Sequence, residues 1–517
     1  LRSMEVIEEE ALRVLRALGD TESKKVITTI GAEQEYFLVD KRQYQQRKDL
    51  IFTGRTLFGA MPPKGQEMED HYYGSIKEKI GKFMREIDIE LWKLGVPSKT
   101  KHNEVAPAQH ELAPIFATAN VASDQNQLVM EVLQKVANRH DLACLLHEKP
   151  FRGVNGSGKH DNWSLVTDTG INLFSPGKQP KENLSFLIFL AATIEAVDKH
   201  ADLLRLSAAT AGNDHRLGGN EAPPAIISIF LGDQLTELLY HIARGEEMDD
   251  LTKEVMEMGV ATLPKLKKEV TDRNRTSPFA FTGNKFEFRM FPSSGCISEA
   301  NVIMNTMVAE TLHEFADKLE GAEDLQKAVN RIVRHALKNH GRIIFNGNGY
   351  SEEWVEEAAR RGLPNYTSTV DVIPALISQK SIDLFSKLKV FSEVELHSRY
   401  EILIEEYYKT INIEARTMLS MAKTQIMPAV INYMTQVAQN VSIMTSLEKF
   451  NIDAQSEMLT ELNTLLNSLK RAIDELEIVH KETIQIEEGL EKAQAFRNNV
   501  LPKMEALREV ADKLETI

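Results

Sequence analysis

The chain has 517 residues, which is too long for one simple hydrophobic core, so we expect two or more packed units. A hydrophobic content of 42% and an aromatic content of 7% are typical of an ordered globular protein. The formal net charge of −15 argues against a nucleic-acid partner bound through its phosphates. A local basic site for a small anion is still compatible with the 61 Lys and Arg residues.

Cysteines and apolar runs bear on the cellular compartment. The two cysteines are Cys144, in an apparent helix, and Cys296, just after a predicted strand. Neither belongs to a Cys-x-x-Cys motif, so a reducing compartment is the simpler interpretation. The most apolar run, residues 184–197, is too short to span a bilayer, and no signal-peptide pattern opens the sequence. The sequence therefore predicts a cytoplasmic protein without a membrane partner.

The first half of the chain mixes predicted helices with predicted strands. An amphipathic helix over 4–18 precedes a β-branched and aromatic strand over 26–38. Residues 40–70 are polar and contain several Gly and Pro, which predicts a long irregular segment, more often functional than idle. Apolar residues at helical spacing predict three more helices, over 75–94, 123–147 and 183–208.

From Ile297 onward the sequence predicts nearly continuous helix. Between residues 459 and 476, apolar residues alternate at spacings of three and four, which is typical of helix–helix seams. Residues 483–517 show a similar pattern. Neither stretch carries residues suited to chemistry, so we interpret both as packing or assembly surface.

Two acids on the first predicted strand point to a possible cation site. Glu33 and Glu35 are two residues apart, so their side chains project from the same face. Two carboxylates at such a short separation resist joint ionisation unless a cation lies beside them. Carboxylate oxygens are suitable ligands for Mg²⁺ or Mn²⁺. Solvated acids on an exposed strand edge explain this pair about equally well on their own.

Further candidates follow in three loops. Glu104 and Glu111 flank a proline turn that can bring them together, although acids at this spacing are common. His160 follows a Gly-rich turn that is not a Walker loop, and a lone histidine is more often structural than a ligand. In the loop over 211–224, Arg216 and Glu221 are either surface charges or a substrate clamp and a lid acid.

A basic turn at residues 272–278 precedes a strictly alternating strand. On that strand Lys285, Glu287 and Arg289 share one face, while the intervening phenylalanines enter the core. This face is either a salt-bridged surface or a metal-binding glutamate between two cations that hold phosphate. We favour the second interpretation.

Taken in order, these motifs resemble the glutamine synthetase family across most of residues 26–292. The matching motifs are the Glu33-x-Glu35 strand, the turn over 103–111, the loop over 155–160, the Arg216…Glu221 loop, Asn274-Arg275, and the Lys285-x-Glu287-x-Arg289 strand. The 40–70 insertion and the long helical C-terminus look most like the type III bacterial branch. The resemblance implies an α+β fold, with a curved, mainly antiparallel sheet flanked by helices and a long all-helical C-terminal region.

The resemblance also implies how the chain divides into domains. Residues 1–25 would be an N-terminal helix, 26–345 the catalytic domain with its 40–70 insertion, and 346–517 a helical extension. Family members carry a β-grasp domain before the first acidic strand, and its aspartate completes the ammonium site of a neighbouring subunit. We therefore expect this chain to be a piece of a longer protein.

The activity implied is ATP-dependent ligation of ammonia to the side-chain carboxylate of L-glutamate. The reaction would pass through γ-glutamyl phosphate and give L-glutamine, ADP and phosphate, with two or three Mg²⁺ or Mn²⁺ ions bound. The resemblance implies a homo-oligomer of two stacked hexameric rings. The alternatives are a γ-glutamyl ligase that uses a larger amine, and a non-catalytic relative that serves assembly or regulation.

Residue roles carry over by position. The implied metal ligands are Glu35, Glu104 and Glu111 for the metal nearer the substrate, and Glu33, His160 and Glu287 for the metal at the ATP phosphates. The implied ATP-binding residues are Lys285, Arg275, His102 and Ser164. Arg275 and Arg289 would also neutralise the phosphoryl group as it transfers. Arg216, Arg289, Asn155 and Gly156 would bind glutamate, and Glu221 would close the site and accept the ammonium proton.

Overall fold

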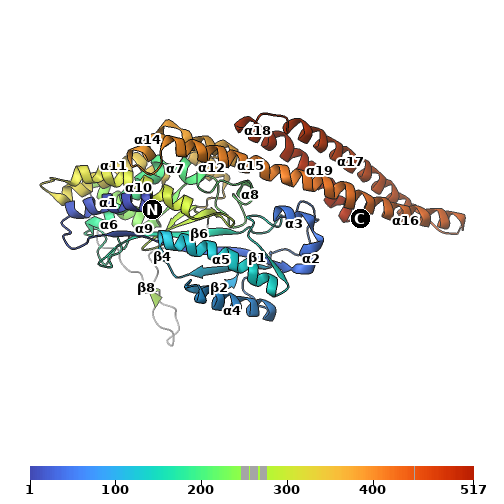
Figure 1. Cartoon of the computed structure of the whole chain (residues 1–517), viewed down its shortest axis with the longest axis horizontal. Coiled ribbons are helices and arrows are strands. Elements are labelled where there is room, and N and C mark those ends of the chain that lie inside the picture. The colour runs from blue at the N-terminus through green and yellow to red at the C-terminus, as the bar shows by residue number, and fades with distance from the viewer. Residues whose placement is uncertain (246–254, 257–265, 268–275, 448) are drawn as a thin grey trace.

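A mixed but mainly antiparallel sheet organises the first half of the chain (Figure 1). The structure is a computed structural model that describes residues 1–245, 255–256, 266–267, 276–447 and 449–517. Within these residues nine strands form one sheet, with the path β2-β3-β1-β6-β11-β10-β7, and β4 and β5 also pair with β1. The pairing is antiparallel except between β10 and β7.

The strands have these bounds: β1 Val26–Asp40, β2 Ser98–Asn103, β3 Gln109–Pro114, β4 Ala117–Thr118, β5 Leu142–Leu145, β6 Gly158–Thr167, β7 Ile229–Phe230, β10 Phe279–Phe281 and β11 Phe286–Pro292. A separate two-stranded ladder joins β8 (Val255–Met256) to β9 (Leu266–Lys267). The central strand β1 alternates between buried and half-buried residues along its first half, and is buried on both faces from Glu35 to Leu38. There Tyr36 and Leu38 pack under residues of two helices on one face, while Phe37 on the other face packs in a small cluster with Leu50 and Val154.

Helices pack mainly on the face of the sheet that carries Ile30 and Trp163, opposite Glu33 and Glu35. In the first half they are α1 Arg2–Ala17, α2 Lys41–Gln46, α3 Lys48–Thr53, α4 Glu78–Lys93, α5 Ala119–Arg139, α6 Leu184–Lys199, α7 Ala201–Leu206, α8 Ala211–Asp214, α9 Asp233–Arg244, α10 Ser298–Leu319 and α11 Leu325–His340. The main core lies between the sheet and α1, α6 and α10, and contains Trp163 and Phe286. A second core buries Tyr36 and Leu38 under α4 and α5.

The second half is helical and ends in an extended helical region over 422–517, which we call the arm. Its helices are α12 Glu352–Arg360, α13 Thr369–Val372, α14 Gln379–Lys387, α15 Glu393–Met421, α16 Met427–Ser446, α17 Asp453–Thr483, α18 Leu490–Ala495 and α19 Leu501–Glu515. Short 3₁₀ turns span Gly341–Ile343 and Ile373–Ile377. Figure 1 shows α16 reaching away from the sheet, α17 running back alongside α16, and α19 lying near α3. The predicted α+β fold with a long helical C-terminal region is therefore confirmed.

Two π-helical turns lie within the arm, over Ala422–Ile426 and Phe496–Val500. Each is followed within two residues by a proline, Pro428 or Pro502, at the start of the next helix. A proline has no N–H to donate, so the wider turn lets the helix continue past the missing hydrogen bond. Helices α15 and α16 therefore form one long rod.

Three predicted elements differ from the structure. The helix predicted over 123–147 ends at Arg139, and Cys144 lies on strand β5, so its assignment to a helix was wrong. The helix predicted over 183–208 is interrupted at His200 between α6 and α7. The segment over 40–70 is less irregular than predicted, because α2 and α3 occupy its first part.

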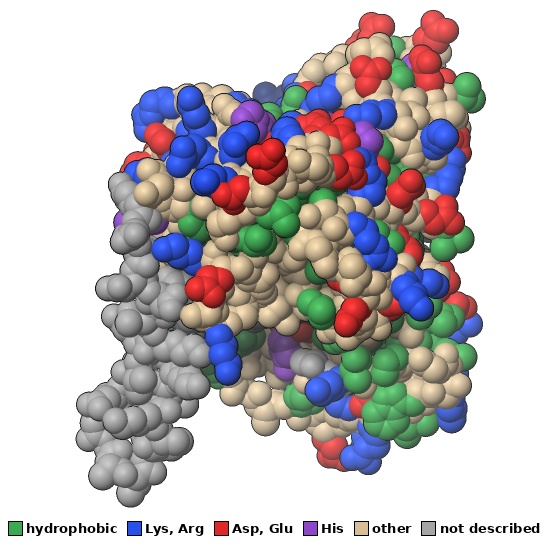
Figure 2. Space-filling view, turned by 90° about the vertical axis from the view of Figure 1, so that its left-hand side faces the viewer, with side chains coloured by type: hydrophobic (Ala, Val, Ile, Leu, Met, Phe, Trp, Pro, Cys, Tyr) green, Lys and Arg blue, Asp and Glu red, His purple; other side chains and the backbone are tan. Residues whose placement is uncertain are grey.

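Two surface properties bear on partners. Among the described residues, no helix combines the length and the apolar character that crossing a bilayer requires. Acidic and basic side chains are intermingled over the face shown in Figure 2 and are not segregated by sign.

Candidate active site and metal centre

A cavity of about 280 Å³ opens over the middle strands of the sheet. Its wall is strongly acidic, and it also contains one arginine and two histidines. The lining residues are Glu33, Glu35, Tyr72, His102, Glu104, Glu111, Ala113, His160, Glu221, Glu287 and Arg289. All six residues to which the family resemblance gives a metal-binding role therefore face one space.

Strand register explains why these residues meet. Glu35 lies opposite Glu111 on β3, and Glu33 lies opposite His160 on β6. Directly opposed side chains on neighbouring strands share a face of the sheet and lie close together. His102 on β2 is in turn opposite Glu111. The acidic site is thus a row that crosses β2, β3, β1, β6 and β11.

The donor atoms are close enough to share cations. His160 Nδ1 lies 3.0 Å from Glu33 Oε2 and 3.0 Å from Glu287 Oε1. One ligand atom each from Glu33, Glu111 and His160 falls within a 4.8 Å group, and the same holds for His102, Glu104 and Glu111. Carboxylate-rich sets of this size suit hard divalent cations, so this donor set fits Mg²⁺ or Mn²⁺.

Burial of so many acids perturbs their pKa values. Burial, with the neighbouring charges of Glu35 and Glu111, raises the pKa of Glu104 to about 8. Burial also raises the pKa of Glu35. Burial opposes a charge on His160, but hydrogen bonds to Glu287 and Glu33 outweigh it and hold the His160 pKa well above its usual value. The cluster therefore needs positive charge, which this imidazole supplies in part.

His102 lies among carboxylates. Its Nε2 is 3.1 Å from Glu111 Oε1, and its Nδ1 is 3.4 Å from Glu104 Oε1. The hydrogen bond to Glu111 raises the pKa of His102 to about 9. Its assignment to the nucleotide stays a prediction, and its position is equally compatible with a role beside the cation-binding acids.

Arg216 is buried directly beneath the Gly-rich turn. Its guanidinium donates to the backbone carbonyls of Arg289 at 3.2 Å and Met290 at 3.3 Å. A Cβ placed on Gly158 would lie 2.2 Å from Arg216 Nη2, so glycine is required there for space. The buried Nε of Arg216 has no hydrogen-bond partner among the described residues. This guanidinium can therefore take a further anionic partner.

Asn155 joins the Gly-rich turn to the loop that carries Glu221. Asn155 Nδ2 donates to Glu221 Oε2 at 2.9 Å, and Gln66 Nε2 donates to Asn155 Oδ1 at 2.8 Å. Asn220 and Glu221 both have positive φ, 53° and 65°. Non-glycine residues seldom adopt this conformation, and such strain concentrates at ligand clamps and lids.

The remaining predicted residues lie apart from the acidic cavity. Lys285 Nζ donates to Thr282 Oγ1 at 3.2 Å, and Ser164 Oγ donates to the carbonyl of Asn284 at 2.9 Å. Neither side chain lines the cavity, and nor does Gly156, which packs against Arg216. Arg275 lies outside the described residues.

The sequence reasoning missed two residues of this region. Tyr72 lines the cavity, with its ring centroid 6.2 Å from that of His102. The Gln66 side chain accepts a hydrogen bond from the backbone N–H of Asn155 and donates one to Asn155 Oδ1. Both residues come from a polar segment in which no periodicity marks a functional position. The one available signal was the length of the irregular segment predicted over 40–70, which contains Gln66 and ends just before Tyr72.

A buried, carboxylate-rich donor set on a mainly antiparallel sheet is typical of enzymes that bind divalent metal ions. Sequence comparison gives the family. The model described as "Glutamine synthetase, catalytic domain" matches residues 11–227, and the one described as "Glutamine synthetase C-terminal domain" matches residues 328–445. The chain belongs to the glutamine synthetase family.

Curated relatives match along the whole chain. A glutamine synthetase of Butyrivibrio fibrisolvens is 50% identical over 523 residues, which cover all of this chain and 74% of the relative. A type-3 glutamine synthetase of Dictyostelium discoideum is 45% identical over 525 residues, covering all of this chain and 71% of the relative. A glutamine synthetase of Bacteroides fragilis is 43% identical over 527 residues, covering all of this chain and 72% of the relative. The resemblance in the sequence motifs is confirmed.

Proposed function

We propose that the chain ligates ammonia to the side-chain carboxylate of L-glutamate at the expense of ATP, and gives L-glutamine, ADP and phosphate. The observation that carries this proposal is the row of acids and one imidazole across five strands, closed by Glu221 and Arg289. Membership of the glutamine synthetase family supports the choice of reaction.

The acids and His160 would hold the divalent cations. In this proposal Glu33, His160 and Glu287 form one ligand group, and Glu35, Glu104 and Glu111 form the other. When bound, the cations neutralise the phosphate oxygens and the crowded carboxylates together. One oxygen of Glu33 and one of Glu287 each lie 3.0 Å from His160 Nδ1, which supports their acting as one group.

The cationic side chains would act on the phosphoryl group and on glutamate. The glutamate carboxylate attacks the γ-phosphorus of ATP, the bond to ADP breaks, and ammonia then displaces phosphate from γ-glutamyl phosphate. Arg289, Arg275 and Lys285 would stabilise negative charge on the transferring group. Arg216 would bind the glutamate α-carboxylate, as its buried Nε allows.

Glu221 would control the last step. Its carboxylate can accept a proton from ammonium, and the positive φ values at Asn220 and Glu221 fit a loop that must hold one conformation over the substrate. Asn155 fixes one Glu221 oxygen at 2.9 Å. Ser164 and His102 are proposed to lie near the nucleotide.

The cellular setting follows from the same proposal. We expect a cytoplasmic homo-oligomer of two stacked hexameric rings. Sedimentation velocity on the purified full-length protein would measure the assembly, and a monomer at micromolar concentration would contradict it.

Product analysis tests the reaction. Purified full-length protein with ATP, Mg²⁺ and glutamate should release ADP when ammonium is added, and mass spectrometry should detect glutamine in equal amount. Release of ADP only with methylamine or a polyamine would instead favour a ligase for larger amines. Mg²⁺-dependent ATP binding without any turnover would favour a non-catalytic relative.

A further inference from the structure

A second cavity lies between the inserted segment and the C-terminal helices, and we call it the junction cavity. Its volume is about 430 Å³, within the range of about 300–1,000 Å³ typical of small-molecule sites. It is lined by Arg55, Thr56, Leu57, Lys149, Arg152, His215, Met418, Leu501, Pro502, Met504, Glu505 and Arg508. None of these residues belongs to the acidic cavity described above.

The wall of the junction cavity combines basic and apolar side chains. Four lining side chains are Lys or Arg, and Glu505 is the one acid among the lining residues. The His215 imidazole is neutral at physiological pH, because the Arg55 charge and burial lower its pKa to about 3. Leucine, methionine and proline side chains complete the lining. The cavity is thus suited to a molecule with an anionic head and an apolar body.

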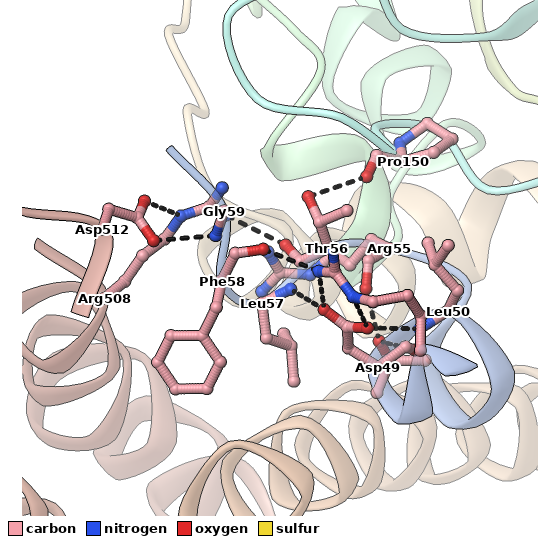
Figure 3. A network of polar contacts seen from close by, with 12 residues as sticks. Asp49, Leu50, Arg55, Thr56, Leu57, Phe58, Gly59, Pro150, Arg508 and Asp512 are labelled. Atoms are coloured by element: carbon pink, nitrogen blue, oxygen red, sulfur yellow. Dashed lines mark hydrogen bonds and ion pairs between the residues drawn. The ribbon is translucent and has the colours of Figure 1, made fainter. Parts of the chain in front are cut away.

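Two of the four cations already have protein partners that fix the wall. Arg55 binds both carboxylate oxygens of Glu414, at 2.6 and 2.7 Å. Arg508 donates to the Thr56 carbonyl at 2.9 Å and to Asp512 at 3.1 Å. Figure 3 shows residues 55–59 between Asp49 of α3 and the side chains of Arg508 and Asp512 of α19. These two arginines therefore fix the shape of the cavity. Because their charges are already engaged, they contribute less to the binding free energy of a ligand.

The same segment is anchored from its other side. The fully buried Asp49 accepts hydrogen bonds from Leu57 N at 2.9 Å and from Arg47 Nη2 at 2.6 Å (Figure 3). Gly59 N donates to Asp512 at 2.7 Å. A wall fixed before a ligand arrives reduces the ordering cost of binding.

The other two cations are available to a ligand. Lys149 Nζ donates to the Val154 carbonyl at 2.5 Å, and it forms no ion pair with an acid in the part of the chain that the structure describes. Burial and the Arg216 charge lower the pKa of Lys149 to about 8, so a bound anion would relieve an unfavourable charge. Arg152 pairs with Glu505 at 2.5 Å, but both side chains are about half exposed, at 50% and 49%. Such an exposed pair is easily exchanged.

The junction cavity is also linked to the proposed glutamate site. Val154, which accepts the Lys149 hydrogen bond, precedes Asn155, and Asn155 holds Glu221. His215 precedes Arg216 in the sequence. A change in the position of Lys149 or His215 would therefore reach the Gly-rich turn, the Glu221 loop or the buried guanidinium.

We propose that the junction cavity binds a small organic anion with a phosphate or carboxylate head and an apolar body, and that the bound anion changes the KM for glutamate. Lys149 and Arg152 bind the head, while Leu57, Met418 and Leu501 contact the body. The coupling to KM rests on the proposed glutamine synthesis, whereas the binding itself does not.

Calorimetry tests the binding. The full-length protein, saturated with Mg²⁺ and a non-hydrolysable ATP analogue, is titrated with phenyl phosphate and separately with phenylacetate, which distinguishes the two head groups. At least one probe should bind with one site per chain. Its Kd should rise about tenfold or more in Lys149→Gln/Arg152→Gln, as expected for lost charge-assisted hydrogen bonds. Lys93→Gln/Arg139→Gln, which removes two surface cations on α4 and α5, should leave the Kd unchanged.

The outcomes separate binding from function. Absence of binding by both probes, or an equal Kd in Lys149→Gln/Arg152→Gln, overturns the proposed site. Retained binding in Arg152→Lys shows that the charge at this position is what matters and excludes a folding defect. Binding that leaves the KM for glutamate unchanged overturns the coupling alone. If the protein made no glutamine, the calorimetric result would still decide whether the site exists.

Discussion

Glu287 is the most deeply buried acid at the active-site cavity, with 1% of its surface exposed. It lies between His160 at 3.0 Å and Arg289 at 3.2 Å, so it contacts a cation on each side. Close to Glu287, Asn162 Nδ2 donates a hydrogen bond to Glu33 Oε1 at 2.9 Å. At this scale the site is a set of charged groups whose partners lie on the same strand, as Arg289 does, or on the neighbouring strand, as His160 does.

The first prediction concerns Glu287→Gln, which keeps the side-chain shape and removes the charge. We expect Mg²⁺ affinity and ADP release to fall by about 10–100-fold or more, because a proposed ligand is lost and His160 loses a partner. Mg²⁺-dependent ADP release would measure both effects. Glu78→Gln, at an exposed acid on α4, is the control. Equal Mg²⁺ dependence in both variants would contradict the metal-ligand role.

The second prediction concerns Gly158→Ala. The added Cβ would lie 2.2 Å from Arg216 Nη2, so the guanidinium must move. Loss of one charge-assisted hydrogen bond to glutamate corresponds to a KM increase of about 10–100-fold. Steady-state kinetics against glutamate would measure it, with kcat changing less than KM. Gly81→Ala meets one atom only, at 3.9 Å, and should behave like the wild type.

Single residues also show what the sequence could and could not reveal about the site. The two-residue spacing of Glu33 and Glu35 on β1 was readable because strand periodicity puts both on one face. The pairing of Glu33 with His160 was not readable, because register between distant strands is a tertiary property. Only the family resemblance joined those motifs. Gln66 and Tyr72 had no periodic pattern to reveal them.

At the scale of elements, the long helix α15 is bound to the inserted segment by one buried ion pair. Arg55 and Glu414 have exposed side-chain fractions of only 12% and 3%. Removing one partner of such a pair leaves the other charge buried and typically costs about 3–5 kcal/mol. The junction cavity depends on this contact, since Arg55 forms part of its wall.

The third prediction follows from that pair. Glu414→Gln should lower the urea midpoint of unfolding, while Glu401→Gln, at an exposed position on α15, should not. Burial opposes the Glu414 charge, but Arg55 outweighs it and places the Glu414 pKa below the ordinary 4.5. The pair therefore stabilises fully above pH 4.5 and loses its effect as pH falls through the lower pKa of the folded chain. A difference between variant and wild type that stays constant below pH 4.5 would contradict this account.

The fourth prediction concerns the arm. Leu469 is fully buried and lies on α17, which packs against α16 and α19. Leu469→Ala should destabilise the arm by about 2–5 kcal/mol. Hydrogen exchange should speed up in α16 and α17 and stay unchanged in β1. Ile478→Ala, at a residue 56% exposed on the same helix, is the control. Faster exchange throughout the sheet would show that the arm and the sheet unfold together.

The elements also explain which parts of the fold were predictable. The alternation before Arg289 predicted strand β11, and apolar spacing predicted α4 and α17. The end of α5 was missed because Asp141 adopts φ of 53° without a glycine to signal it. The next four residues then pair with β1, which no local pattern indicates. Likewise, neither Gly nor Pro marks the break at His200 between α6 and α7.

At the scale of the whole molecule, the carboxylates of the acidic cavity repel one another and lower the stability of the folded chain, and a bound cation reduces this repulsion. Ligands that bind only the folded chain raise its stability by mass action. The fifth prediction is that free Mg²⁺ at about 100 times its Kd raises the free energy of unfolding by about 2.7 kcal/mol. Thermal melts with Mg²⁺ and with EDTA would measure the shift. Glu287→Gln should lose most of it, and an equal shift in that variant would place the stabilising ion elsewhere.

The row of donors that crosses five strands has a consequence for biosynthesis. Glu33 through His160 emerge from the ribosome before Glu287 and Arg289, which follow His160 only after more than a hundred further residues. A nascent chain that has not yet reached β11 lacks the strand that closes this row beside β6. Such a nascent chain already contains several of the carboxylates, but the complete set of donors is assembled only when β11 has paired with β6. Competence for chemistry therefore requires that β11 has been synthesised and has paired with β6, and a product terminated before β11 cannot reach it.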